Sequence, residues 1–212
     1  MSTRVVSIAA DGGQEARSAL EECVASGGVA VFPADGVYGL CCDPLDPEAI
    51  DRIHSIKGRD EGKSSAVLYF SPLAMRELVS GLTPRVAEAV GRLLPGPLTL
   101  ILPNPEGRYP LACREDPERL GVRLIDGPLS GMALPVFQTS ANLSGSPAVS
   151  DFSRIDDSVV TQVDLAIDGG ELQGEASTVI DLTGYEGGGE WKILREGAVP
   201  PDRLNGILED GR

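Results

Sequence analysis

The sequence is poor in the side chains on which several functional classes depend. It has one histidine (His54), one tryptophan and four cysteines in 212 residues, and no two cysteines stand at Cys-x-x-Cys spacing. A structural zinc site and a Ser–His–Asp hydrolase are therefore not expected. The cysteines are predicted to be reduced and mostly buried. His54 falls in a predicted helix, where we expect it near solvent.

Cations are scarce too. Lysine and arginine number 18 against 32 acidic residues, which gives a net charge of -14. Nonspecific binding of a polyanion needs many cations, so this composition argues against a broad nucleic-acid surface. It does not exclude one local basic pocket, and a basic cluster in such an acidic chain is informative.

The sequence has no basic start followed by a long apolar run, and no stretch approaches the about 18 apolar residues of a membrane span. We expect a cytoplasmic protein without a membrane partner. An apolar content of 42% suffices for a packed core. No repeat or composition shift marks a second domain, so 1–212 is predicted to be one domain, with a motif-bearing core at about 14–200 and a short C-terminal helix over 201–212.

Short apolar blocks alternate with helical patterns along the chain. This mixture predicts an α/β fold with a twisted mixed sheet, partly antiparallel and partly parallel, and helices on its faces. Predicted helices, some with Ser, Thr or Asp before a proline, cover 14–26, 47–56, 71–80 and 83–95. Predicted strands cover 29–33, 37–43, 64–70, 96–103, 119–125, 163–170, 177–183 and 192–198, with another entering the polar loop at 138.

Neither GxxxxGK[ST] nor GxGxxG is present, so any nucleotide site must use other loops. The first candidate is KGRDEGK, which places Lys57, Arg59 and Lys63 in a predicted loop between a helix and a strand. Such a loop can direct an arginine fork and two ammonium groups at one phosphate or carboxylate. The alternative is a solvated loop whose cations pair with Asp60 and Glu61.

Two further regions carry polar groups at strand ends. QTSANLSG offers Ser140 and Asn142 in a loop that could form an anion-binding nest, or an ordinary turn. Ser177 begins one predicted strand and Arg195 ends another. Arg123 alternates with apolar neighbours in GVRLID, so it faces either a cleft or solvent.

Seven motifs occur in order: FPADGVYGL, KGR with a later Lys63, PGPLTLIL, GVRL, TSANLSG, STVIDL and ILREGAV. Over about 27–198, this set resembles the YrdC/YciO/YwlC family of threonylcarbamoyl-AMP synthases, in its short single-domain form. The resemblance implies a YrdC-like fold with a large, basic, concave cleft. It also implies a nucleotidyltransferase that condenses L-threonine, bicarbonate or CO2, and ATP into threonylcarbamoyl-AMP and pyrophosphate.

That product would serve the threonylcarbamoyladenosine (t6A) modification of tRNA through a downstream tRNA threonylcarbamoyl-transfer complex. Family members are also described as binding double-stranded RNA. By the family pattern, ATP would be bound by Arg59, Lys63, Ser140, Asn142 and Arg195. Mg²⁺ would be carried on the ATP phosphates, with few protein ligands of its own.

The catalytic groups implied by the resemblance are Lys57, Arg59, Ser140 and Asn142. The threonine site would comprise Tyr38, Arg123 and Ser177, with Arg123 pairing with the carboxylate.

The chain departs from the family on the threonine side. The family reads PTETVYG where this chain reads PADGVYG, so Gly36 replaces a threonine, and a family histidine falls at about Leu68. Two alternatives therefore stand beside the synthase. One is a YciO-like paralogue that forms an adenylate from another carbamate or carbamoyl substrate. The other is a nonenzymatic module that binds double-stranded RNA.

Overall fold

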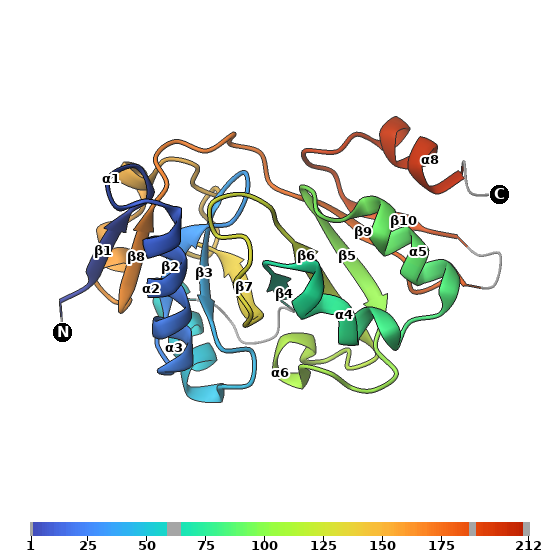
Figure 1. The fold of residues 1–212 in the computed structure, drawn as a ribbon, viewed down its shortest axis with the longest axis horizontal. Coiled ribbons are helices and arrows are strands. Elements are labelled where there is room, and N and C mark those ends of the chain that lie inside the picture. The colour runs from blue at the N-terminus through green and yellow to red at the C-terminus, as the bar shows by residue number, and fades with distance from the viewer. Residues whose placement is uncertain (1, 59–64, 187–189, 210–212) are drawn as a thin grey trace.

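The structure is a computed structural model that describes residues 2–58, 65–186 and 190–209. Ten strands of the described chain form one mixed sheet in the order β1-β8-β2-β3-β7-β4-β6-β5-β9-β10 (Figure 1). The strands are β1 (Arg4–Ser7), β2 (Ala30–Pro33), β3 (Tyr38–Cys42), β4 (Ala66–Tyr69), β5 (Leu98–Pro103), β6 (Arg119–Leu124), β7 (Val136–Ser140), β8 (Leu165–Asp168), β9 (Thr178–Asp181) and β10 (Lys192–Arg195). The predicted twisted mixed sheet is thereby confirmed.

Helices flank this sheet. They are α1 (Ile8–Asp11), α2 (Gly13–Ala25), α3 (Pro47–Lys57), α4 (Pro72–Ser80), α5 (Pro84–Leu93), α6 (Pro110–Cys113), α7 (Asp157–Val160) and α8 (Pro201–Glu209), with a 3₁₀ turn at Phe152–Arg154. Asp46 caps α3 by accepting hydrogen bonds from the amides of Glu48 and Ala49, and Ser71 caps α4 in the same way. None of the helices in the described part of the chain is long and apolar enough to cross a bilayer.

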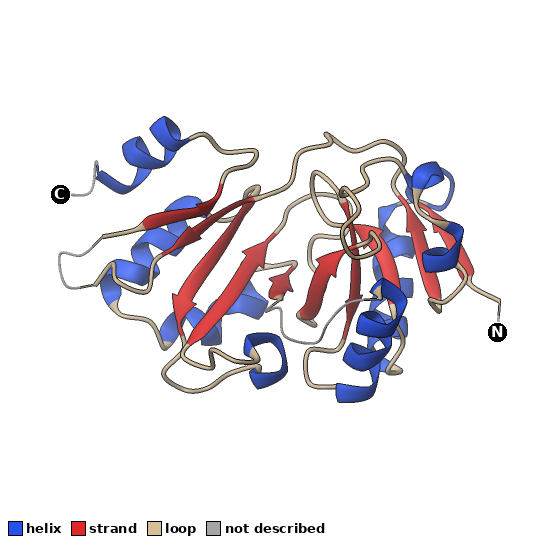
Figure 2. Ribbon diagram, turned by 180° about the vertical axis from the view of Figure 1, so that it is seen from behind, coloured by secondary structure: helices blue, strands red, loops and turns tan. Residues whose placement is uncertain are grey.

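The central strands have one face in the core and one face open. In β5 and β6, Leu98, Leu100 and Leu102 and their counterparts Leu120, Val122 and Leu124 belong to the core that includes the apolar faces of α4 and α5. The intervening residues point the opposite way, because side chains alternate along a strand. In Figure 2, which shows the molecule from behind, β5 and β6 lie in front of the helices that cover them in Figure 1.

A long connection ties the two halves of the sheet together. After β8, which lies near one edge, residues 169–177 cross the top of the molecule in Figure 1 to reach β9 near the other edge. Leu172 and Gly174 donate backbone hydrogen bonds to Ser150 and Gly36 on the way. The connection therefore passes beside the turn at 34–37 before it delivers Ser177 to the head of β9.

The prediction that His54 lies near solvent is wrong. The His54 ring is 3% exposed and lies edge-on to Phe137 of β7, with ring centroids 6.0 Å apart. The buried face of α3 is wider than its isoleucines alone suggest, because β7 packs along the side that carries His54. The cysteines agree with prediction: all four are thiols, with Cys41, Cys42 and Cys113 buried and Cys23 partly exposed.

Candidate functional site

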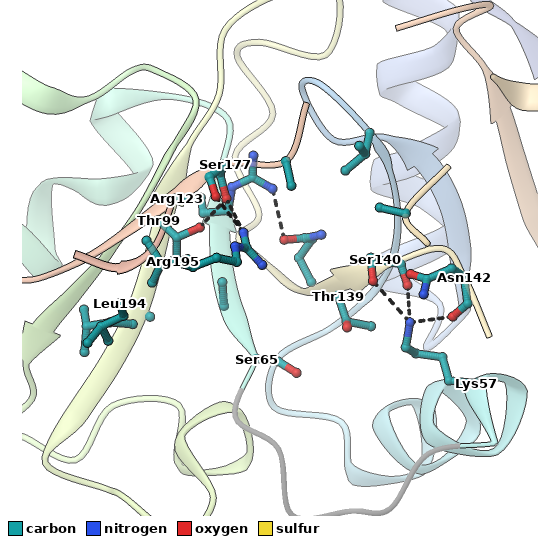
Figure 3. A pocket seen from close by; sticks show the side chains of 18 of the residues that line it. Lys57, Ser65, Thr99, Arg123, Thr139, Ser140, Asn142, Ser177, Leu194 and Arg195 are labelled. Atoms are coloured by element: carbon teal, nitrogen blue, oxygen red, sulfur yellow. Dashed lines mark hydrogen bonds between the residues drawn. The ribbon is translucent and has the colours of Figure 1, made fainter. Parts of the chain in front are cut away.

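A cavity of about 660 Å³ opens on the uncovered face of the central strands. Its walls come from β4, β5, β6, β7, β9 and β10, the end of α3 and the loop that follows β7 (Figure 3). Four of its described lining residues are cations and one is an acid, and these are Lys57, Arg119, Arg123, Arg195 and Asp116. A net positive cleft in a chain with a charge of -14 is a place where an anion is attracted.

Lys57 is the last residue of α3, so it does not lie in the loop after the helix as predicted. Its side chain is 4% exposed, and its ammonium donates to the carbonyl oxygens of Ser140 and Asn142, the latter at 2.7 Å. The amide of Ser144 in turn donates to the Lys57 carbonyl at 2.9 Å. Lys57 thus fixes the main chain of the loop after β7 and brings a positive charge to its inner side (Figure 3).

That loop keeps unused hydrogen-bonding capacity at the cavity wall. The Asn142 side-chain nitrogen donates to the carbonyls of Leu143 and Ser146, whereas its Oδ1 is buried and has no hydrogen-bond partner among the described residues. Across the cavity, the buried Ser65 hydroxyl likewise has no hydrogen-bond partner among the described residues. Buried polar atoms without partners are uncommon, and those that line a cavity are candidates for contact with a ligand or water.

Arg123 projects from β6 into the base of the cavity and is 4% exposed. Its Nη1 donates to Gln138 Oε1 at 3.2 Å and its Nη2 to the Ala34 carbonyl at 3.1 Å, while its buried Nε has no partner within the described chain. Burial lowers the pKa of Arg123 to about 10, with nearby Arg195 acting in the same direction and Asp35 opposing it. The guanidinium is still charged at neutral pH and can accept an anion.

Arg195 stands opposite, at the end of β10, where an irregularity in the pairing with β9 lies between Ile193 and Arg195. It donates to the carbonyl and hydroxyl of Ser177 at 2.7 and 3.1 Å, and that hydroxyl lies 2.8 Å from Thr99 Oγ1. Burial lowers its pKa, and no carboxylate in the described residues pairs with it. Because Arg195 also lowers the pKa of the buried Arg123, an anion bound near both guanidiniums would relieve the repulsion between them.

Arg119 was not predicted as a site residue. It lies four residues before Arg123 on β6. Because side chains alternate along a strand, this spacing puts Arg119 and Arg123 on the same face, and the sequence could have revealed it. Its Nη2 donates to Asp181 Oδ2 at 2.6 Å, and its Nη1 lies 3.4 Å from Asp116 Oδ2. Because two carboxylates already face Arg119, it contributes less attraction for an incoming anion than Arg195 does.

The structure therefore brings six of the predicted site residues to one cavity: Lys57, Arg123, Ser140, Asn142, Ser177 and Arg195. Tyr38 is not among the lining residues. Its buried hydroxyl donates to the Gly170 carbonyl at 2.7 Å and accepts from the Gly169 amide at 2.9 Å, so it anchors the connection after β8. Arg59 and Lys63 lie outside the described residues.

The two departures from the family pattern have a packing explanation. A Cβ on Gly36 would lie 2.1 Å from the Glu175 carbonyl oxygen, so the present backbone leaves no room for a threonine there. Leu68 is fully buried beside Arg123 in the β4–β6 register and belongs to the core cluster that α2 covers. A polar side chain at either position would need a different path for the turn at 34–37 or a different core.

Replacing Gly36 by alanine is expected to destabilise the fold by about 1–3 kcal/mol, because the new methyl group meets backbone that cannot rotate away. The matched control is Gly91→Ala in α5, where a Cβ meets nothing within 4 Å. There we expect a gain of about 0.5–1 kcal/mol from helix propensity. Urea unfolding would measure the change in unfolding free energy of both variants. An unchanged midpoint for Gly36→Ala would show that the turn can shift to make room for the methyl group.

The fold and the cleft together define an α/β protein with a basic cavity on the open face of a mixed sheet. A family model described as "Sua5_yciO_yrdC: Telomere recombination" matches residues 22–197. The chain belongs to this family, and the resemblance seen in its motifs is confirmed.

Three relatives illustrate the likeness. The chain is 31% identical over 201 residues to a threonylcarbamoyl-AMP synthase of Pyrococcus abyssi, which covers 89% of this chain but 56% of that protein. The structure of P. abyssi Sua5 complexed with L-threonine superposes with a TM-score of 0.82 at 27% identity, over 98% of this chain and 61% of that one. Escherichia coli YciO gives a TM-score of 0.77 at 28% identity, over 96% and 100%. The chain thus spans little more than half of the first relative's length.

Proposed function

We propose that the cleft binds ATP and an acceptor, and that the protein is a nucleotidyltransferase of the threonylcarbamoyl-AMP synthase type. The observation that carries this proposal is the pair Arg123 and Arg195, a buried cation and a more exposed one, which face one cavity without enough acidic partners to neutralise them. The positions of these residues match the family motifs, and relatives at about this identity are named threonylcarbamoyl-AMP synthases. The finer assignment of substrates to this chain follows from that likeness.

The proposed reaction needs positioning and charge neutralisation more than covalent help from the protein. The amine of L-threonine adds CO2 and loses a proton to give a carbamate. A carbamate oxygen then attacks the α-phosphorus of ATP, the bond between that phosphorus and the bridging oxygen to the β-phosphate breaks, and pyrophosphate leaves. Cations held in a partly dehydrated cavity stabilise the charge that develops on the phosphoryl oxygens.

Within this scheme Arg195 would bind the phosphates, together with Arg59 and Lys63, while the loop amides and Ser140 hold the nucleotide. Asn142 Oδ1 is a buried acceptor that suits an amine or a hydroxyl of a substrate. Lys57 would act through the loop that it fixes and through its charge. Arg123 would pair with the threonine carboxylate, with Ser177 beside it.

The described residues contain no group of three or more His, Cys, Asp or Glu arranged to hold a metal ion. The one acid among the described lining residues, Asp116, is engaged by Arg119. These residues suit a Mg²⁺ that arrives on the nucleotide, with phosphate oxygens and water as its ligands. The metal would neutralise phosphate charge during transfer.

The proposal predicts pyrophosphate release from ATP and bicarbonate that depends on L-threonine. An enzyme-coupled phosphate assay with and without threonine measures it, with other amino acids as controls. Threonine-dependent release together with isolation of the mixed anhydride would support the synthase. A protein that binds ATP without threonine-dependent release would contradict it.

A second candidate is a YciO-like enzyme that forms an adenylate on a different carbamate or carbamoyl acceptor. The close approach of Gly36 to Glu175 favours it, since the hydroxyl that the family places there has no room. The same release assay run across a panel of amines and carbamoyl compounds separates the two candidates. Binding of tRNA or double-stranded RNA, and delivery to a downstream transfer complex, stay predictions from the family resemblance.

A further inference from the structure

A carboxylate of the chain itself lies beside Arg123, a buried cation of the cleft. Asp35 is in the turn between β2 and β3, and its Oδ2 is 3.7 Å from Arg123 Nη2. The same Nη2 donates to the carbonyl of the preceding residue, Ala34, at 3.1 Å. Asp35 makes the one ion pair that Arg123 has within the described part of the chain.

The turn that carries Asp35 is held in place from both sides. Asp35 adopts a left-handed φ of 77°, which aspartate tolerates better than most residues, and the Ala34 amide donates to the Val37 carbonyl across the turn. Behind it, Gly174 donates to the Gly36 carbonyl at 2.9 Å and Gly36 lies directly against Glu175. The backbone of the turn is therefore held close to Arg123.

Asp35 removes part of the charge that Arg123 would offer to a ligand. The side chain of Asp35 is 30% exposed, so its interaction with Arg123 is only partly screened by water. The Arg123 Nε is buried and has no hydrogen-bond partner among the described residues. A carboxylate bound beside the Arg123 guanidinium would be attracted by Arg123 and Arg195 but repelled by Asp35, whereas an uncharged group would feel little repulsion.

We infer that Asp35 is a specificity-determining residue that weakens the binding of acceptors carrying a carboxylate at the Arg123 end of the cleft. The ligand class that it favours is an amine whose group at that place is a hydroxyl, an amide or another neutral acceptor. This inference rests on the proposed function, because it takes the Arg123 end of the cleft as the acceptor site.

Calorimetric titration with L-threonine and L-threoninol tests the inference, because these ligands differ only in carboxylate against hydroxymethyl. Both are titrated into the wild type and Asp35→Asn, which keeps the size of the side chain and removes its charge. We expect Asp35→Asn to bind L-threonine about tenfold more tightly, as loss of a nearby repulsion predicts. Its affinity for L-threoninol should stay within about twofold. Asp202→Asn, which removes the charge of an exposed acid in the first turn of α8, should change neither affinity.

Three results would overturn the inference: an unchanged ratio of the two affinities, a weaker affinity of Asp35→Asn for both ligands, or no binding of threonine to Asp35→Asn. The second result would make Asp35 a residue that orients Arg123. The titrations are run with and without ATP, and ATP binding is measured separately. If the proposed function is wrong, ATP will not bind. The ratio of the threonine and threoninol affinities, measured without ATP, still decides the role of Asp35.

Discussion

The variant Lys57→Met is expected to lower nucleotide-dependent turnover by about a hundredfold, since small misplacements of binding groups cost factors of this size. Methionine fills a similar volume but leaves the carbonyls of Ser140 and Asn142 without their buried donor. The loop after β7 should then rearrange. The free energy of unfolding should fall by about 1–3 kcal/mol, as it does when other buried acceptors lose their hydrogen-bond donor.

The matched control is Lys192→Met on β10, where the lysine is exposed. It should leave both turnover and the urea midpoint unchanged. Pyrophosphate release and urea unfolding are measured on the two variants side by side. If Lys57→Met releases pyrophosphate at the wild-type rate, the loop does not depend on the ammonium group.

The variant Arg123→Ala should raise the threonine concentration for half-maximal rate by ~10- to 100-fold, as expected for loss of charge-assisted hydrogen bonds. The ATP requirement should move far less, because Arg195 and the loop after β7 remain. Arg123→Lys should recover only part of the loss, since an ammonium cannot reproduce the planar fork that reaches Gln138 and Ala34 together.

Rates are measured over a grid of threonine and ATP concentrations. Arg76→Ala, which removes an exposed arginine of α4, is the control and should alter neither requirement. Equal increases in both requirements for Arg123→Ala would instead assign Arg123 a structural role.

Much of the fold could be predicted because apolar blocks bounded by proline and glycine mark its inner strands. The strand β1 was missed because RVVS is four residues long, half polar, and is recruited by a partner at 165–168. The short helices α6 and α7 were missed for a similar reason, since four residues carry too little periodicity to detect. The order of the strands in the sheet depends on these distant pairings.

For the cleft, the sequence predicted which residues line it better than it predicted the contacts that those residues make. Strand alternation correctly predicted that Arg123 faces away from its apolar neighbours. Local sequence could not reveal that the Lys57 ammonium is bound by carbonyls more than 80 residues away, or that Gly36 touches Glu175. These contacts depend on how segments far apart in the sequence pack together, and a single sequence does not reveal that packing.

The position of β8 between β1 and β2 also bears on how the chain is made. Partners of β1 lie about 160 residues downstream, so at typical ribosomal speeds the nascent N-terminal strand waits roughly 10–30 s for them. The cations arrive in stages as well, because Arg195 belongs to β10, which follows the other nine strands of this sheet along the chain. A ligand that needs both guanidiniums can therefore stabilise the chain only after β10 has been made, and cannot assist the earlier steps of cotranslational folding.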